Sequence, residues 1–101
     1  MTDLIIRKKF PAPVDQAAVA ASWRDRGYSC HLFSDPPGQE WNGFVHATNE
    51  LLSVLDGELE LTIGNDRYTA GPGDEVFIPR DAVHSVKNIS TGQTRWLFGY
   101  D

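Results

Sequence analysis

Cysteine and histidine are scarce in this chain of 101 residues, which contains one cysteine and three histidines. A single thiol cannot build an internal framework of disulfides. The same counts exclude a closed zinc site of the Cys₂His₂ or Cys₄ type, because such sites need at least two cysteine ligands. Metal-binding side chains must therefore be sought one by one among the histidines and the acidic residues.

Basic residues are also few, with nine lysines and arginines against fourteen aspartates and glutamates and a formal net charge of −5. Because the basic residues are scattered, nucleic acid and anionic membranes are unsuitable partners. The chain has no run of about 18 apolar residues, and its start shows no long apolar core followed by a small-residue cleavage site. These absences predict a cytoplasmic protein.

The length predicts one domain that covers residues 1–101. A chain of this size buries roughly 60 to 65% of the surface that it exposes when unfolded, which is enough for one core and no more. Any active site must therefore lie inside that core or on its rim.

One helix is predicted, over residues 14–26 in an alanine-rich segment. Asp15 is a suitable N-cap residue, and Gly27 is a suitable residue to follow the last turn. Val19 and Trp23 are four positions apart and share a helix face, so we expect Trp23 to pack against a sheet.

After the helix the sequence changes to short runs of β-branched and aromatic residues, separated by turn signals such as Asp56-Gly57. In one run, Leu59, Leu61 and Ile63 alternate with polar residues, which is typical of a strand with one covered face. Comparable runs lie at 41–47, 50–55, 58–63, 66–70, 75–79, 82–88 and 95–100. No helical pattern separates these runs, so they predict antiparallel strands in an all-β sandwich or small barrel.

His46, Glu50 and His84 are the most informative polar residues. Strand alternation directs His46 to one face of the run 41–48, and Glu50 begins the next run. If the run 82–88 faces them across a barrel interior, His84 can converge with both. Two imidazoles and one carboxylate are a ligand set for a divalent first-row metal with open coordination positions.

These residues belong to two longer patterns. The first consists of Gly38, five residues, Phe44-Val45-His46, three residues, Glu50, six residues and Gly57. The second consists of Gly73, five residues, Pro79-Arg80-Asp81, two residues, His84, three residues and Asn88.

Both patterns resemble the two motifs of the cupin family. The first cupin motif is Gly, five residues, His-x-His, three or four residues, Glu, six residues and Gly, from which this chain departs only at Phe44. The second motif is Gly, five residues, Pro-x-Gly, two residues, His, three residues and Asn, from which it departs only at Asp81. The match spans residues 38–88, and the 15 residues 58–72 between the motifs also resemble the spacing of small members.

The resemblance implies an all-β fold: a cupin-type antiparallel β-barrel (double-stranded β-helix or jelly roll) with one short N-terminal helix. The N-terminal strand and helix would occupy residues 1–27 and the barrel residues 28–101. It also implies a divalent metal ion (Fe, Mn, Ni or Zn), a small-molecule ligand or substrate, and a homodimer. The segment Leu4–Phe10 is a candidate for a strand exchanged between subunits, because an isolated β segment needs a sheet edge to pair with.

Phe44 is the important departure, because a phenyl ring cannot replace the first histidine of a three-His, one-Glu site. His46, Glu50 and His84 would remain as an open two-His, one-carboxylate set. Asp81 is a mild departure, because aspartate tolerates the left-handed backbone that glycine usually adopts.

Alternative interpretations stay open for each of these residues. His46 and His84 can be ordinary core histidines, whereas a buried Glu50 needs a cation, a proton or hydrogen-bond donors. His31 belongs to neither motif and is interpreted as structural or exposed, with the further option that it replaces the missing ligand. Cys30 is interpreted as a small buried apolar residue.

Several aromatic residues near the motifs are candidates for the lining of a substrate pocket: Trp41, Phe44, Phe77, Trp96, Phe98 and Tyr100. Such a lining favours a small organic ligand with an apolar portion. The hypotheses are then a small metalloenzyme, a non-catalytic barrel that binds or senses a metal or small molecule, and a barrel that has lost its ligand. The sequence identifies neither catalytic residues beyond the metal ligands nor the reaction.

Overall fold

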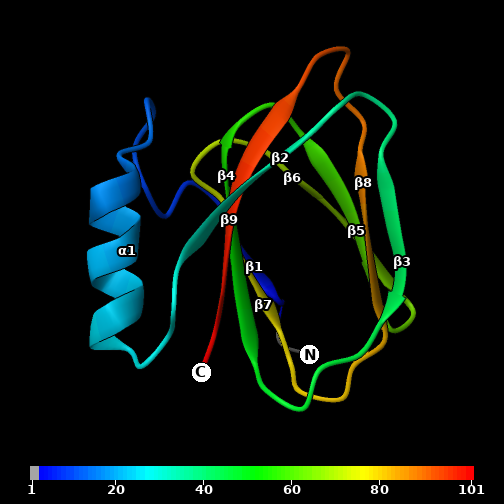
Figure 1. Ribbon diagram of the computed structural model, residues 1–101, viewed down its shortest axis with the longest axis horizontal. Helices are drawn as coiled ribbons and strands as arrows, with labels where there is room; N and C mark the ends of the chain where they lie inside the picture. The colour runs from blue at the N-terminus through cyan, green and yellow to red at the C-terminus, as the bar shows by residue number, and fades with distance from the viewer. Residues whose placement is uncertain (1–2) are drawn as a thin grey trace.

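The computed structural model describes residues 3–101, which form two antiparallel sheets and one helix (Figure 1). The five-stranded sheet has the order β1 (Ile5–Ile6), β7 (Glu75–Ile78), β4 (Glu50–Asp56), β9 (Thr94–Tyr100) and β2 (His31–Asp35). The four-stranded sheet has the order β3 (Glu40–Phe44), β8 (His84–Asn88), β5 (Leu59–Ile63) and β6 (Asp66–Ala70). The predicted all-β antiparallel jelly roll is confirmed, although the sheets remain separate and do not close into one continuous barrel.

The main core lies between the two sheets. It contains Leu52 and Val54 of β4, Leu59 and Leu61 of β5, and Trp96 of β9, all buried. The predicted alternation in β5 is therefore confirmed, because its odd-numbered residues point inward. Strand β4 is buried on both faces, which explains why its sequence shows no such alternation.

Helix α1 (Gln16–Asp25) covers the outer face of the five-stranded sheet (Figure 1). As predicted, the Asp15 carboxylate caps it by accepting a hydrogen bond from the Ala17 N–H at 3.0 Å. Val19 and Trp23 are fully buried in this second cluster. No helix among residues 3–101 is long and apolar enough to cross a membrane.

A partly buried ion pair between Arg26 and Glu75 fastens the helix to the sheet. The Trp23 indole N–H donates to a carboxylate oxygen of Glu75 at 2.8 Å, and the Arg26 guanidinium donates to both oxygens at 2.9 Å. The hydrogen bond with Glu75 raises the pKa of Arg26 despite the opposing effect of its burial. The Glu75 charge is thus satisfied by donors within the fold.

The N-terminal segment differs from the prediction for residues 4–10. Only Ile5–Ile6 forms a strand, and it pairs with β7 of the same chain. Asp74 holds the residues that follow, because its carboxylate accepts from the Lys8 N–H at 2.9 Å and from the Arg7 guanidinium at 3.0 Å. In this structure the segment therefore pairs with a sheet edge of its own chain.

Strand β2 was missed by the sequence prediction. Four of its five residues are exposed, because it is the edge of its sheet, and it lacks the apolar alternation of an inner strand. Its partner is β9, along which His31 lies opposite Phe98 and Asp35 opposite Thr94.

Gly57 and Asp81 are among the motif residues that adopt left-handed backbone conformations. Gly57 has φ of 97°, and a Cβ placed there would lie 2.1 Å from Thr94 Oγ1, so only glycine fits. Asp81 has φ of 64°, as expected for the residue that replaces the motif glycine.

Candidate metal centre and ligand cavity

The first motif enters the site through a β-bulge in β3. Trp41 lies opposite Val86, and Phe44 lies opposite His84, so Asn42 and Gly43 together face the single residue Ser85. Gly43, the second of the two bulge residues, has φ of 71°, a left-handed conformation that glycine adopts readily. The extra residue turns Trp41 and Phe44 to the same side of the sheet, where both line one cavity.

Strand β3 ends at Phe44, so His46 lies in the following loop and not in the longer strand that the sequence predicted. Glu50 begins β4 and lies opposite Tyr100, the last residue of β9. His84 begins β8 in the other sheet. The fold thus brings a loop and the ends of two strands together.

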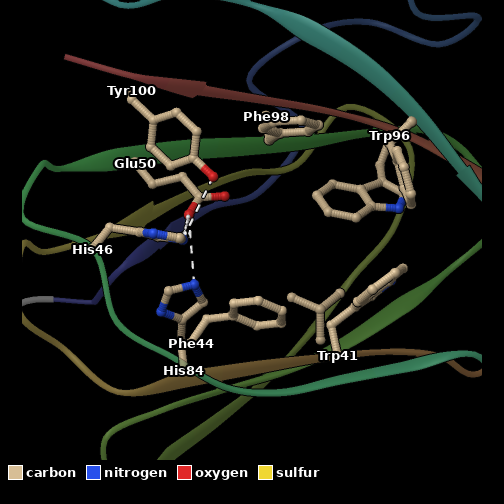
Figure 2. Close-up of a pocket in the computed structure, with 10 residues that line it drawn as sticks. Trp41, Phe44, His46, Glu50, His84, Trp96, Phe98 and Tyr100 are labelled. Carbon is tan, nitrogen blue, oxygen red and sulfur yellow. Dashed lines mark hydrogen bonds and ion pairs between the residues drawn. The ribbon is translucent and has the colours of Figure 1, made fainter.

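The side chains of His46, Glu50 and His84 converge, with one potential ligand atom from each lying within 4.8 Å of the others. Figure 2 shows both imidazoles directed at the carboxylate, whose Oε1 lies 3.5 Å from Nε2 of His46 and 3.5 Å from Nε2 of His84. Glu50 and His84 are buried, and His46 is partly exposed. The convergence proposed from the sequence spacing is therefore present in the structure.

The protonation of His84 follows from its other ring nitrogen. Its Nδ1 lies 3.1 Å from the carbonyl oxygen of Ala82. Because a carbonyl can only accept, Nδ1 carries the proton, and the neutral ring presents a lone pair on Nε2. That lone pair faces Oε1 of Glu50, so two acceptors point at each other.

The carboxylate itself shows what the cluster lacks. Oε1 of Glu50 is buried and has no hydrogen-bond partner. An unpartnered buried charge is costly, so this oxygen needs either a metal cation or a proton on a neighbouring imidazole. The donor set of two nitrogens and one carboxylate oxygen fits a divalent first-row metal.

The pKa of His84 reflects the same arrangement. Burial lowers the pKa, but hydrogen bonding of the imidazolium to Glu50, hydrogen bonding to Ala82 and the charge of Glu50 together outweigh it, and the pKa lies above its usual value of 6.5. A proton on Nε2 would therefore occupy the position that a metal would take.

Tyr100 completes this end of the cavity. Its hydroxyl lies 3.5 Å from Nε2 of His46 (Figure 2). Burial, and then the charge of Glu50, raise the pKa of Tyr100. The phenol therefore stays neutral and available as a hydrogen-bond donor near physiological pH.

Phe44 stands beside the cluster in the position of the missing histidine. Its ring centroid lies 6.2 Å from those of His46 and His84. His31 does not replace the missing ligand: it is exposed and packs on Phe98, with centroids 5.4 Å apart. Cys30 is partly buried beside the outer cluster, and this burial raises the pKa of its thiol.

A cavity of about 260 Å³ opens from the cluster into the space between the sheets. Its walls are formed by Phe33, Trp41, Phe44, His46, Glu50, His84, Val86, Trp96, Phe98 and Tyr100. Five of the six aromatic residues predicted for the pocket lie in these walls, and Phe77 does not. Phe77 projects from β7 toward the outer cluster, because its neighbours Val76 and Ile78 take the inward positions.

Sequence reasoning missed Phe33 and Val86 as lining residues. Phe33 lies in the unpredicted strand β2, so no signal placed it near the site. Val86 was detectable, because it is two residues from His84 and shares its strand face.

Asp35 organises the end of the cavity far from His84. Its carboxylate is 1% exposed and accepts from the indole N–H of Trp41 at 3.1 Å and from that of Trp96 at 3.0 Å. Asn88, the last residue of the second motif, donates its amide to the carbonyls of Asp35, Pro36 and Gly92, each at 3.0 Å. The motif asparagine therefore has a structural role.

Comparison with known proteins finds relatives in sequence and in fold. A curated relative, quercetin 2,3-dioxygenase of Bacillus subtilis (strain 168), is 38% identical over 74 residues, which are 70% of this chain and 22% of that protein. The chain thus spans about a fifth of the length of this relative.

Solved structures show the same fold at lower identity. The cupin domain of Cnp3 from Schizosaccharomyces pombe has a TM-score of 0.68 at 19% identity, covering 72% of this chain and 54% of that one. A cupin 2 domain-containing protein from Halorhodospira halophila has a TM-score of 0.68 at 20% identity, covering 73% and 52%. The family model described as a cupin domain matches residues 31–100. This chain therefore belongs to the cupin family.

Proposed function

We propose that this chain is a small metalloenzyme that acts on a small organic substrate, with a divalent metal held by His46, Glu50 and His84. The observation that carries the proposal is the buried Oε1 of Glu50, which has no hydrogen-bond donor and faces the Nε2 lone pair of His84. A cation at this point would satisfy both atoms at once.

Iron, manganese, nickel or zinc would suit these ligands, and such a metal would supply Lewis acidity or, for iron, manganese and nickel, redox chemistry. Three protein ligands leave more positions free for a substrate than four would. Phe44 contributes an apolar wall where other cupins have a ligand, so the substrate would meet a phenyl ring beside the open positions.

The rest of the cavity supports binding of a largely apolar molecule. Seven of its ten lining residues are aromatic or aliphatic side chains without a charge or an imidazole, Tyr100 included. The Tyr100 hydroxyl is placed to donate a hydrogen bond to a substrate oxygen near His46. The name of the curated relative makes dioxygenation the first reaction to test.

The decisive experiment is elemental analysis of protein purified without chelator, for the native chain and for the variants His84→Ala and Glu50→Gln. We expect about one divalent metal per chain in the native protein and little in either variant. His31→Ala is the matched control, because it removes a histidine outside the cluster and should keep the metal. Equal metal content in all four proteins would refute the assignment.

Activity separates an enzyme from the alternative, a barrel that binds or senses a small molecule without converting it. Oxygen consumption with quercetin and other small phenols tests dioxygenation directly. Stabilisation of the metal-loaded protein by a compound that is recovered unchanged would favour the binding role.

We also propose that the chain forms a homodimer. The large apolar side chains of Ile6 and Leu32 are 51% and 45% exposed, and both lie on strands at the two edges of the five-stranded sheet. A second copy would cover such edges. Light scattering at micromolar concentration tests this, and a monomer mass would contradict it.

A further inference from the structure

The cavity has two chemically different ends. Tyr100, beside the metal ligands, and Trp96, beside Asp35, lie at opposite ends of one stretch of β9 (Figure 2). Four residues of extended strand separate them by about 14 Å. The end near Trp96, here called the aromatic end, is formed by Phe33, Trp41, Trp96 and Phe98.

The rings of the aromatic end pack around Phe33. Its centroid lies 5.7 Å from that of Trp41, 5.7 Å from that of Trp96 and 6.4 Å from that of Phe98, each at a steep interplanar angle. Four rings in different orientations line this end, and aromatic side chains of this kind form the cages that bind quaternary ammonium groups. No lysine or arginine of residues 3–101 contributes to the cavity walls.

Asp35 lies behind this wall as a buried negative charge. Its donors are two neutral indole N–H groups, and no ion pair joins it to a cation of the described chain. The bonds from Asn88 to the backbone of Asp35 and Pro36 fix its position. Glu75, by contrast, has its buried charge balanced by Arg26.

This difference has an electrostatic consequence for the ligand. The indole N–H groups donate to Asp35, so the positive edges of both indoles are already engaged, and the carboxylate adds electron density to the rings. Because Asp35 is buried, its negative potential near the rings is only partly screened by solvent. An anionic group would be repelled at this end, and a neutral group would gain nothing from the charge.

We propose that the aromatic end of the cavity binds an organic cation, such as a trialkylammonium group, through the rings of Trp41 and Trp96 backed by the Asp35 carboxylate. The cationic group of the ligand would then lie at the aromatic end, and its metal-binding oxygens would lie at the opposite end of the cavity, beside the metal ligands. This assignment rests on the proposed function only in treating the bound cation as part of the substrate.

The test compares two probes that differ in one atom, choline and its uncharged carbon analogue 3,3-dimethylbutan-1-ol. Binding of each to metal-loaded and to chelator-treated protein is measured by calorimetry. We expect choline to bind roughly tenfold more tightly than the alcohol in both preparations. A cavity without a preference for cations would favour the alcohol, because the alcohol is cheaper to remove from water.

Asp35→Asn should abolish this preference, and Asp66→Asn, the same change at an exposed position on β6, should leave it intact. If Asp35→Asn does not fold, Trp41→Phe replaces it: choline binding should weaken, and alcohol binding should change little. Equal or tighter binding of the alcohol by the native protein, or no choline binding at millimolar concentration, overturns the inference.

The metal assignment and the cation site can be refuted independently of each other. A protein that is purified without metal and takes up none when metal is added, yet prefers choline, would remove the metal assignment and keep the cation site. A metal-bound protein that prefers the alcohol would keep the metal assignment and remove the cation site.

Discussion

Nε2 of His84 and Oε1 of Glu50 lie 3.5 Å apart and, while the imidazole is neutral, no hydrogen stands between them. Their repulsion in the metal-free protein, and its relief by a cation, determines how the site should respond to mutation and to pH.

Glu50→Gln should stabilise the metal-free protein while it weakens metal binding. The amide can donate to the Nε2 lone pair of His84, so we expect a gain of about 1 kcal/mol in unfolding free energy with chelator at pH 9. Metal affinity should fall by roughly tenfold or more. Urea denaturation and metal titration measure the two effects.

Glu75→Gln is the matched control for that change. It is also a buried glutamate, but Arg26 and Trp23 already satisfy it, so the substitution should destabilise the fold by about 2 kcal/mol. Equal losses of stability in the two variants would show that Glu50 is satisfied without a metal.

The pH dependence of the metal-free protein follows from the raised pKa of His84. Its folded-state pKa lies above the unfolded value, so this stabilisation is fully present below about pH 6.5 and is lost as pH rises through the folded pKa. Metal binding has the opposite trend, because metal displaces the proton: the apparent Kd should rise about tenfold for each unit of pH below the folded pKa.

Urea denaturation with chelator and metal titration, both between pH 5.5 and 9, test these trends. His84→Ala should remove the loss of stability that the metal-free protein shows as pH rises, and it should lower the metal affinity over the whole pH range. A Kd that does not change over this range would contradict the ligand role of His84.

Phe44→His should strengthen metal binding. The ring at this position already lies 6.2 Å, centroid to centroid, from both histidines, and its side chain is 39% exposed, so an imidazole fits without a large loss of packing. A fourth ligand should lower the metal Kd by roughly tenfold or more. Phe44→Leu controls for the loss of the phenyl ring, and a Kd no tighter than that of Phe44→Leu would count against the geometry.

Gly57→Ala should destabilise the fold by about 3 kcal/mol, because its Cβ would lie 2.1 Å from Thr94 Oγ1 and its φ is 97°. Gly64→Ala separates the effect of the steric clash from the effect of the positive φ. Gly64 also has positive φ, 59°, but a Cβ there meets no atom within 4 Å. Its cost should be about 1 kcal/mol. Thermal or urea unfolding of both variants gives the comparison.

The sequence by itself determined the features that depend on short-range rules. Alternation in β5, the Asp15 cap and the turn at Asp81 follow from local backbone preferences, so the all-β antiparallel class and the helix were predictable. The spacing of His46, Glu50 and His84 indicated a common site through its match to the two cupin motifs. Strand periodicity alone does not place His46, because His46 lies in a loop.

Only the tertiary structure decided which neighbours complete the site. The bulge at Gly43 adds one residue to β3 and so reverses the alternation that sequence assumes. Strand β2 forms through pairing with β9, about 60 residues later, and brings Phe33 into the cavity wall and Asp35 behind it. Alternation puts Phe77 on the opposite face of β7 from Val76 and Ile78, but only the packing of the two sheets decides which face is inward. Ile5–Ile6 likewise pairs with β7, a distant segment that local patterns do not identify.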